Sequence, residues 1–388
     1  MITNVCVNGT YRYPRYIRHY YEAGILGSYF YSHRIATTAR KLGIPRAKAR
    51  NYWLKEYALH TTLKVFRPKL GVGVAVAFGD FWQAHVIRNW TDCDTVEGVV
   101  GQISDKVFAH AKKKGARVLG HPVNSHPEVF TELLNAEHEF LGLRGPKYAV
   151  SARQLAEIDI CDQLVVDSKF VADSYISRGY PKSRIVVVRP GADLERFKPL
   201  HGPTERDDQL FRAICVGAIT PRKGQRYLLK AWKRLALPNS ELVLVGAKDA
   251  TGNRIVAGFE EDFRHYAYVP NTDLSKLLAT ADVFVLPSIE DGYSQAAIEA
   301  LTAGIPVITT TNNGVADVIS DGFNGYIVPP GDFNALAEVL NRLYCNRDLA
   351  RQMGRDAANQ IAQEFSWRKY VDQLVKIHRG LLCDRDGN

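Results

Sequence analysis

Short runs of β-branched and aliphatic residues alternate along this chain with amphipathic helical stretches, and this alternation constrains the fold more than any other feature. In the first half, such runs occupy residues 71–78 (GVGVAVAF), 116–121 (ARVLGH), 162–168 (DQLVVDS) and 184–191 (RIVVVRPG). The stretches between them carry apolar residues at helical spacing. This rhythm is typical of βαβ units, in which helices cover a parallel sheet. The sequence therefore predicts an α/β fold built on parallel sheets.

The rhythm stops at a polar segment, residues 198–208, and then restarts with runs at 211–220, 241–247, 282–288 and 305–310. A chain of 388 residues is long enough for two domains with substantial cores. We therefore expect two Rossmann-like, doubly wound domains that face a cleft, with the first at 1–199 and the second at 200–365. The amphipathic stretch that begins at residue 366, together with the tail to residue 388, either closes the second domain or crosses back to the first.

Composition narrows the class of protein. A hydrophobic fraction of 46% and a charged fraction of 23% are ordinary for a globular protein. The longest apolar runs fall far short of the ~18 residues that a membrane span needs. The first residues lack the apolar core of a signal peptide. We therefore expect a cytoplasmic protein. Its six cysteines show no paired spacing, so neither a disulfide framework nor a zinc site is predicted.

Positive charge is concentrated at the start of the chain. Residues 1–70 hold 13 Lys and Arg against Glu22 and Glu56, a local balance of +11 within a net charge of +9. Aromatic residues interleave these cations, a pattern that favours a surface for phosphates of lipid, nucleic acid or a polyanionic substrate. The other interpretation is a solvated basic face whose rings pack inward. Both remain open from the sequence.

A loop with an acid on each side follows the predicted strand at 282–288. Gly292 permits a tight turn, and Ser294 is a candidate N-cap for a helix that ends at Gly304. Ligands of open parallel sheets bind at the carboxyl ends of the strands. An acid inside that helix, Glu299, is suited to accept hydrogen bonds from sugar hydroxyls. The alternative is an ordinary surface glutamate.

A second loop carries two adjacent cations at the end of a strand. Gly217 ends the run at 211–217, and Arg222, Lys223 and Gly224 follow before a helical stretch. Arginine offers a fork of donors, lysine a compact charge, and glycine allows close approach of the backbone. This pair suits a diphosphate, although a solvated basic turn has the same composition.

These segments together resemble the retaining GT-B glycosyltransferases of family 4. The resemblance rests on an ordered series at 216–232 (VGAITPRKGQRYLLKAW), 241–247, 268–270, 281–310 (ADVFVLPSIEDGYSQAAIEALTAGIPVITT), 314–332 and 365–370. It extends weakly into the first domain and covers residues from about 107 to 382. Residues 1–100 are similar only in general layout.

The resemblance implies a nucleotide-sugar donor on the second domain and an acceptor on the first. Lys223 and Arg222 would neutralise the diphosphate, and Glu299 would bind the nucleotide ribose. Asp291 would contact the transferred sugar. The loop between these two acids would hold phosphate and sugar through its backbone, and its residues are Gly292, Tyr293, Ser294 and Gln295. Gly217 would lie beside the nucleotide.

This chain departs from the family pattern at two positions. Ala218 stands where the family commonly has an arginine directly after the strand glycine, so Arg222 is a candidate replacement. Asp291 stands where a glutamate is usual, and the neighbouring Glu290 is the alternative acid. In the first domain, His126 resembles the family histidine near the donor sugar, and His121 is its rival.

The resemblance also implies a chemistry without a required protein base, cofactor or metal. The acceptor hydroxyl would attack from the face that the diphosphate leaves, with retention of configuration, and the donor would be a UDP- or GDP-linked sugar. The Asp-x-Asp patterns at 92–94 and 384–386 lack a matching context for a metal site. We expect a role in cell-surface polysaccharide or glycoconjugate synthesis, with a saccharide or lipid-linked acceptor. Peripheral contact with anionic membrane at its inner face is expected, and nucleic acid is not.

Two other classes of function remain. A glycoside hydrolase would use Asp291 and Glu299 as its acid pair, but it has no need for a diphosphate turn at Arg222 and Lys223. A non-catalytic binder of anionic membrane or nucleic acid would explain residues 1–70 but not the second domain.

Overall fold

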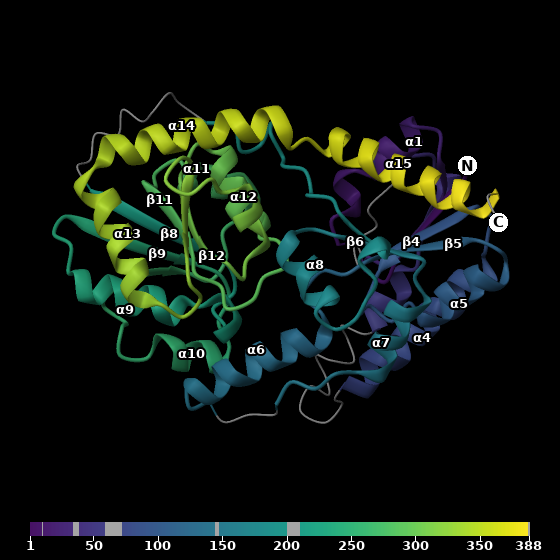
Figure 1. The fold of residues 1–388 in the computed structure, drawn as a ribbon, viewed down its shortest axis with the longest axis horizontal. Helices are drawn as coiled ribbons and strands as arrows, with labels where there is room; N and C mark the ends of the chain where they lie inside the picture. The colour runs from purple at the N-terminus through teal and green to yellow at the C-terminus, as the bar shows by residue number, and fades with distance from the viewer. Residues whose placement is uncertain (10, 34–38, 59–71, 144–146, 200–209, 387–388) are drawn as a thin grey trace.

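The computed structural model describes residues 1–9, 11–33, 39–58, 72–143, 147–199 and 210–386. They form two domains, each with one parallel sheet between layers of helices, as predicted (Figure 1). The seven-stranded first sheet has the order β3-β2-β1-β4-β5-β6-β7. Its strands are β1 (Thr3–Val7), β2 (Leu26–Tyr31), β3 (Ala49–Asn51), β4 (Thr95–Val99), β5 (Arg117–His121), β6 (Gln163–Val166) and β7 (Ile185–Val187).

The six-stranded second sheet has the order β10-β9-β8-β11-β12-β13. Its strands are β8 (Phe211–Val216), β9 (Ser240–Val245), β10 (Arg264–Tyr266), β11 (Val283–Leu286), β12 (Val307–Thr310) and β13 (Gly325–Val328). All strand pairs in both sheets are parallel. Buried parallel strands read as continuous apolar runs, which explains why β8, β11 and β12 are recognisable in the sequence.

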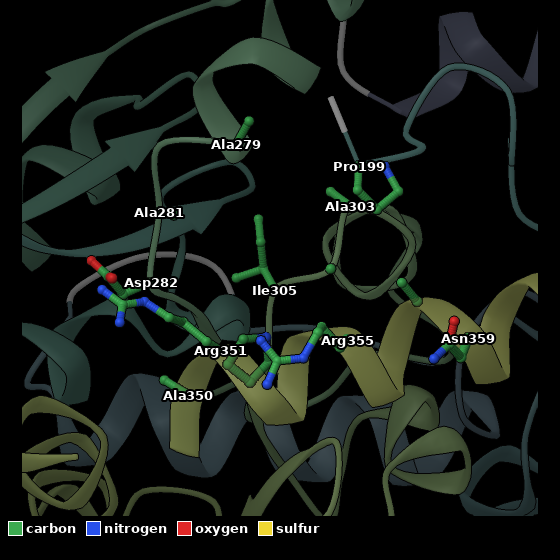
Figure 2. Close-up of a pocket in the computed structure, with 13 residues that line it drawn as sticks. Pro199, Ala279, Ala281, Asp282, Ala303, Ile305, Ala350, Arg351, Arg355 and Asn359 are labelled. Atoms are coloured by element: carbon green, nitrogen blue, oxygen red, sulfur yellow. The ribbon is translucent and has the colours of Figure 1, made fainter. Parts of the chain in front are cut away.

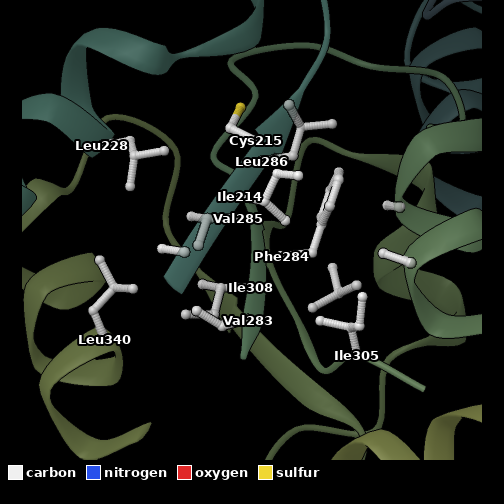
Figure 3. Packing of buried hydrophobic residues seen from close by; sticks show 14 of the residues in the cluster. Ile214, Cys215, Leu228, Val283, Phe284, Val285, Leu286, Ile305, Ile308 and Leu340 are labelled. Carbon is white, nitrogen blue, oxygen red and sulfur yellow. The ribbon is translucent and has the colours of Figure 1, made fainter. Parts of the chain in front are cut away.

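Helices follow the strands in βαβ order. Those of the first domain are α1 (Ile17–Glu22), α2 (Ala39–Leu42), α4 (Val72–Arg88), α5 (Asp105–Lys113), α6 (Pro127–Phe140), α7 (Ala152–Ile160) and α8 (Lys169–Ile176). Those of the second are α9 (Gln225–Leu235), α10 (Ala250–Val256), α11 (Asn271–Leu278), α12 (Gln295–Thr302), α13 (Phe333–Cys345) and α14 (Arg347–Glu364). Figure 3 shows the core of the second domain, where Ile214, Phe284 and Ile308 pack between the sheet and these helices.

The last helix, α15 (Trp367–Asp386), leaves the second domain and lies across the first (Figure 1). Its residues Trp367, Tyr370 and Leu374 are buried in the same apolar cluster as Tyr16 and Tyr20 of the first domain. The ring of Trp367 stacks on that of Tyr16 with centroids 5.5 Å apart. The carboxyl end of the chain therefore becomes part of the first domain's core.

One predicted strand is wrong. The run at 71–78 is not extended, because residues from Val72 onward form the long helix α4. Gly79, Trp82, Gln83 and Val86 are buried, and this spacing of three and four residues is that of one helix face. The strand that belongs at this place in the rhythm is β4, whose apolar run is interrupted by Glu97.

The aromatic residues near the start of the chain largely pack inward. Tyr13, Tyr16, Tyr20, Tyr29 and Phe30 are fully buried. For this segment the structure supports the interpretation of a packed face. The cations at 34–38 and 59–71 lie outside the described residues.

Candidate active site

The loop after β8 brings the two adjacent cations to the carboxyl edge of the second sheet. Pro221–Lys223 form a 3₁₀ turn that ends at Gly224, whose φ is 70°. A Cβ at Gly224 would lie 1.9 Å from the carbonyl oxygen of Pro287, so only glycine fits. This contact fixes Arg222 and Lys223 beside the loop that follows β11.

The neighbouring acids Glu290 and Asp291 have different surroundings. Glu290 is fully buried and accepts hydrogen bonds from the N–H and Oγ of Ser125, at 2.9 and 3.0 Å, and from Arg222 at 3.3 Å. Burial raises the pKa of Glu290, and the charge of Arg222 opposes this. Asp291 instead accepts a hydrogen bond from the ammonium of Lys223. Glu290 thus joins the two domains, whereas Asp291 faces Lys223.

Helix α12 begins directly after this loop. The hydroxyl of Ser294 caps it by accepting a hydrogen bond from the N–H of Ala297 at 3.3 Å, as predicted for an N-cap. Glu299 lies within the helix and is 8% exposed. Its Oε1 is 3.4 Å from the guanidinium of Arg15, which belongs to the first domain. Burial raises the pKa of Glu299, and Arg15 acts against this rise. Glu299 is therefore not a surface residue.

A cavity of about 440 Å³ lies between these loops and the first domain. It brings together many of the predicted residues, and its lining comprises Tyr11, Arg12, Arg15, Val216, Gly217, Lys223, Asp291, Tyr293, Ser294, Gln295 and Ala296. Arg222, Gly292, Glu299 and His126 are not among them. Both polar side-chain atoms of Gln295 are buried and have no partner among the described residues.

Gly292 packs against the first domain, whereas its neighbours Asp291 and Tyr293 line the cavity. A Cβ at this position would lie 2.2 Å from the carbonyl oxygen of Val123 in the first domain. Its own carbonyl accepts a hydrogen bond from the hydroxyl of Ser168 at 2.9 Å. Gly292 therefore allows the two domains to approach each other beside the cavity.

Neither histidine candidate lines the cavity. His126 caps α6, its Nδ1 accepting from the N–H of Glu128 at 3.3 Å, and its ring meets that of Tyr175 edge to face. Burial lowers the pKa of His126. His121 is buried inside the first domain, 3.1 Å from Glu97. The structure thus gives both side chains packing contacts, and the role predicted for His126 stays a prediction.

The first domain contributes residues that the sequence analysis did not single out. Tyr11, Arg12 and Arg15 follow β1 and line the cavity. Arg12 is buried and contacts both oxygens of Asp167 at 2.5 Å. The sequence feature that could have identified them is the position of YRYPR just after the first strand, because side chains there reach the carboxyl edge of the sheet.

The domains also meet away from the cavity. The hydroxyl of Tyr227 on α9 donates to Glu137 on α6 at 2.9 Å, and the rings of Tyr227 and Phe140 stack. Glu137 is buried, and desolvation raises its pKa to about 7 although the bond from Tyr227 opposes the shift. The contact between the domains therefore keeps Glu137 in a buried position where its charged form is disfavoured.

Another cavity, of about 290 Å³, lies at the opposite edge of the second sheet (Figure 2). Asp282 and Pro306, which line it, directly precede β11 and β12, so it opens at the amino ends of the strands. Its other labelled residues include Ala303, Arg351 and Arg355. Ligands of open α/β sheets bind at the carboxyl ends, so this cavity is not the candidate site.

In the parts of the chain that the structure describes, no group of three or more His, Cys, Asp or Glu side chains has an arrangement that could hold a metal ion. Among the described helices, none is long and apolar enough to cross a membrane.

Comparison with known proteins finds a family model that matches the second domain. Residues 198–360 match the model of "Glycosyl transferases group 1". An MMP alpha-(1->4)-mannosyltransferase of Mycolicibacterium hassiacum is 28% identical over 239 residues, which cover 60% of this chain and 56% of that protein. A D-inositol 3-phosphate glycosyltransferase of Corynebacterium urealyticum is 29% identical over 254 residues, or 57% and 59% of the two chains. The chain thus spans less than two thirds of the length of these curated relatives.

Solved structures resemble the whole chain. A sucrose-phosphate synthase from Thermosynechococcus elongatus has a TM-score of 0.74 at 17% identity and covers 99% of this chain and 100% of that one. Anabaena HepE, solved in complex with UDP, has a TM-score of 0.70 at 13% identity, covering 98% and 100%. The two sheets and these neighbours establish the GT-B fold, and residues 198–360 of the second domain are similar to glycosyl transferases group 1.

Proposed function

We propose that this protein is a retaining glycosyltransferase of family 4 that moves a sugar from a nucleotide-sugar donor to a saccharide or lipid-linked acceptor. The observation that carries the proposal is the cavity at the domain boundary, where Lys223, Asp291 and the start of α12 meet. A cation, an acid and free N–H groups at a helix start are the groups that a sugar diphosphate needs. The names of the relatives, a mannosyltransferase and an inositol-phosphate glycosyltransferase, support sugar transfer.

We assign different roles to Lys223 and Asp291. Lys223 stabilises the diphosphate as its charge develops, and Asp291 stabilises the cationic sugar ring. In the structure these two side chains are paired with each other. A bound diphosphate would therefore replace Asp291 as the partner of Lys223 and leave the carboxylate for the sugar. Such interactions raise turnover when they are stronger in the transition state than in the ground state.

Arg222 has a position that suits a supporting role. Its guanidinium contacts both the carbonyl and the carboxylate of Glu290, at 3.0 and 3.3 Å. Glu290 in turn binds Ser125 of the first domain. Arg222 therefore helps to hold the domains together, and direct neutralisation of a diphosphate by this residue stays a prediction.

The donor is proposed to carry a uridine or guanosine diphosphate. Structural neighbours solved with UDP and with UDP-glucose support a nucleotide sugar of this kind. A thermal-shift panel of nucleoside diphosphates and their sugars tests the proposal, because a ligand that binds only the folded state raises its melting temperature. Stabilisation by one diphosphate family supports it, and no response to any of them overturns it.

The two other function classes have distinct outcomes. A hydrolase would release free sugar from its substrate without forming an acceptor product. A non-catalytic binder of nucleic acid would bind RNA in a salt-sensitive way without affinity for any nucleotide. Product analysis with and without acceptor separates the three.

Contact with anionic membrane is proposed at an apolar patch of the first domain, formed by Leu54, Tyr57 and Phe81, which line one surface hollow. These side chains are 53–63% exposed, and exposed apolar groups that gather on one face mark interaction surfaces. The exposed Arg50 lies in the neighbouring strand β3, which supplies positive charge next to the patch. A membrane that presents a lipid-linked acceptor would suit both features.

Liposome co-sedimentation tests this contact. Vesicles rich in anionic lipid should bind the protein at low ionic strength, with ~1 kcal/mol for each surface cation, and salt should weaken the binding. Replacing Leu54 and Phe81 with serine should reduce it further. Absence of binding at low salt would overturn the membrane proposal without affecting sugar transfer.

A further inference from the structure

Arg15 is the cation of the cavity whose bonding is least complete. Arg12 is held by both oxygens of Asp167, and Lys223 is held by Asp291. Arg15 makes one contact to a carboxylate, from its Nη2 to Glu299 at 3.4 Å. Its Nη1 is buried and has no hydrogen-bond partner among the described residues. A guanidinium is always charged, so a buried nitrogen without an acceptor is unfavourable unless a ligand provides one.

A second group in the same cavity is also without partners. The side-chain amide of Gln295, at the first position of α12, has its nitrogen and its oxygen buried and unpaired among the described residues. Arg15 and Gln295 belong to different domains but line one space together with Gly217 and Lys223. Unpaired donors from two domains that converge on one cavity indicate a site for an anion that bridges the domains.

The residue that follows Gly217 carries no charge. Ala218 directly follows the strand glycine Gly217, and it is exposed. The nearby Arg222 does not fill this place, since Glu290 holds its guanidinium. On the second domain's side of the cavity, Lys223 is the cation that remains in the lining. A second cation beside Lys223 would stabilise an anion with two charges, and Arg15 of the first domain has an unpaired nitrogen in the same lining.

We propose that Arg15, with the side-chain amide of Gln295, binds a phosphate group of the substrate. The proposal rests on the proposed function, because it assigns a residue of the first domain to the phosphate of that reaction. Arg15 contacts Glu299 and lines the same cavity as Lys223, so a donor diphosphate is one source of the phosphate. A phosphorylated acceptor is the other. Either one would draw the two domains together through Arg15.

Calorimetry on the full chain tests the donor source. UDP, GDP, uridine and guanosine are titrated into the wild type and into Arg15→Gln, Arg15→Lys and Arg18→Gln. The last is a matched control, because Arg18 lies three residues away, is 66% exposed and pairs with Glu22. We expect Arg15→Gln to weaken the diphosphate at least tenfold and to leave the nucleoside within twofold. Arg15→Lys should recover part of the loss, and Arg18→Gln should match the wild type.

The titration with nucleoside distinguishes phosphate binding by Arg15 from a merely structural role of this residue. If Arg15 served only to position Glu299, its loss would weaken nucleoside and diphosphate equally, and that result would overturn the proposal. For the acceptor source, inorganic phosphate is titrated into protein saturated with the diphosphate. A loss of phosphate binding in Arg15→Gln, with diphosphate affinity unchanged, would assign the site to a phosphorylated acceptor.

The proposal and the proposed function fail in different ways. A wild-type protein that binds no nucleoside diphosphate would contradict the function, and inorganic phosphate alone would then still test Arg15. Wild-type binding of diphosphate with no change in either arm for Arg15→Gln would overturn only the role of Arg15.

Discussion

Two groups of buried carboxylates in this protein have similar burial but different surroundings. Glu97 in β4 is fully buried, and its oxygens are contacted by Tyr16, Tyr20, His121 and His378. Asp291 and Glu299 at the cleft are 6% and 8% exposed. Asp291 lies beside Lys223, and Glu299 lies beside Arg15. Both acids are next to a cavity whose lining includes the unpaired polar atoms of Arg15 and Gln295.

The difference shows how to separate a structural acid from a candidate site acid. Burial alone would raise the pKa of Glu97, but the charges and hydrogen bonds of His121 and His378 hold it well below its usual range. His378 belongs to α15, so this cluster fixes the carboxyl-terminal helix to the first sheet. For Glu299, by contrast, burial prevails and the pKa is raised. Side chains of the protein contact both oxygens of Glu97, whereas Glu299 has one contact to Arg15, at 3.4 Å, beside a cavity.

The largest effect is expected where the structural cluster is broken. Glu97→Gln removes one charge of a buried network, and such losses typically cost ~3 to 5 kcal/mol of stability. Chemical denaturation measures this directly. The matched control is Glu22→Gln, whose pair with Arg18 is exposed and contributes little to stability. An unchanged free energy of unfolding for Glu97→Gln would contradict its structural assignment.

The next effect separates the two cleft acids. Glu299→Ala should weaken a free nucleoside diphosphate by ~1.5 to 3 kcal/mol, typical of a hydrogen bond to a charged group, because the ribose is shared by donor and product. Asp291→Asn is nearly isosteric and releases Lys223, so it should not weaken the diphosphate but should lower turnover.

Calorimetry with the diphosphate, beside steady-state kinetics, measures both changes. Equal loss of diphosphate affinity in the two variants would mean that Asp291 is not the acid on the sugar side. Glu290 is then a poor substitute, since its carboxylate is already engaged by Ser125 and Arg222.

Glu137 provides a third kind of carboxylate, which is buried with one hydrogen bond, from Tyr227, while the charge of Lys230 acts against the effect of desolvation. Its folded pKa of about 7 lies above the ordinary value, so the folded protein binds more protons than the unfolded chain between pH ~4.5 and ~7. Its contribution to stability is therefore present at low pH and is lost as pH rises through about 7. Glu137→Gln should flatten this dependence and stabilise the protein by ~1 to 3 kcal/mol above pH 7.

Denaturation at several pH values compares Glu137→Gln with Glu139→Gln, an exposed acid on the same helix. The control should keep the wild-type slope. A steep wild-type loss that persists in Glu137→Gln would assign the pH dependence to another group.

Sequence reasoning succeeded where local patterns decide structure. The strands β8, β11 and β12 are short apolar runs, and turn residues such as Gly217, Pro287 and Gly304 follow or separate them. It failed at 71–78, where alternating Gly and Val suggested a strand although the helical spacing of buried residues continues to Val86. It also missed β4, because a buried Glu97 looks polar unless its partners are known. One of those partners, His378, is 281 residues away.

The candidate site shows the same limit. Lys223, Asp291 and the start of α12 were predicted from neighbouring residues in one domain, and the cavity contains them. Arg15 was not identified, since its contact with Glu299 joins positions 284 residues apart in two domains. Likewise, the engagement of Arg222 by Glu290 depends on a loop geometry that composition does not reveal.

The smallest expected effect is that of chelation. Once a donor is found, activity should persist in excess EDTA, because Lys223 and the proposed Arg15 can provide the positive charge that a divalent ion otherwise supplies to a diphosphate. The two cleft acids already have protein cations as partners, because Lys223 pairs with Asp291 and Arg15 contacts Glu299. We therefore expect that neither acid needs a metal ion. Initial rates with EDTA, with added magnesium and with added manganese are measured on one preparation. Complete loss with EDTA, restored by either metal, would show that the cleft acids serve a metal and that the cations alone are insufficient.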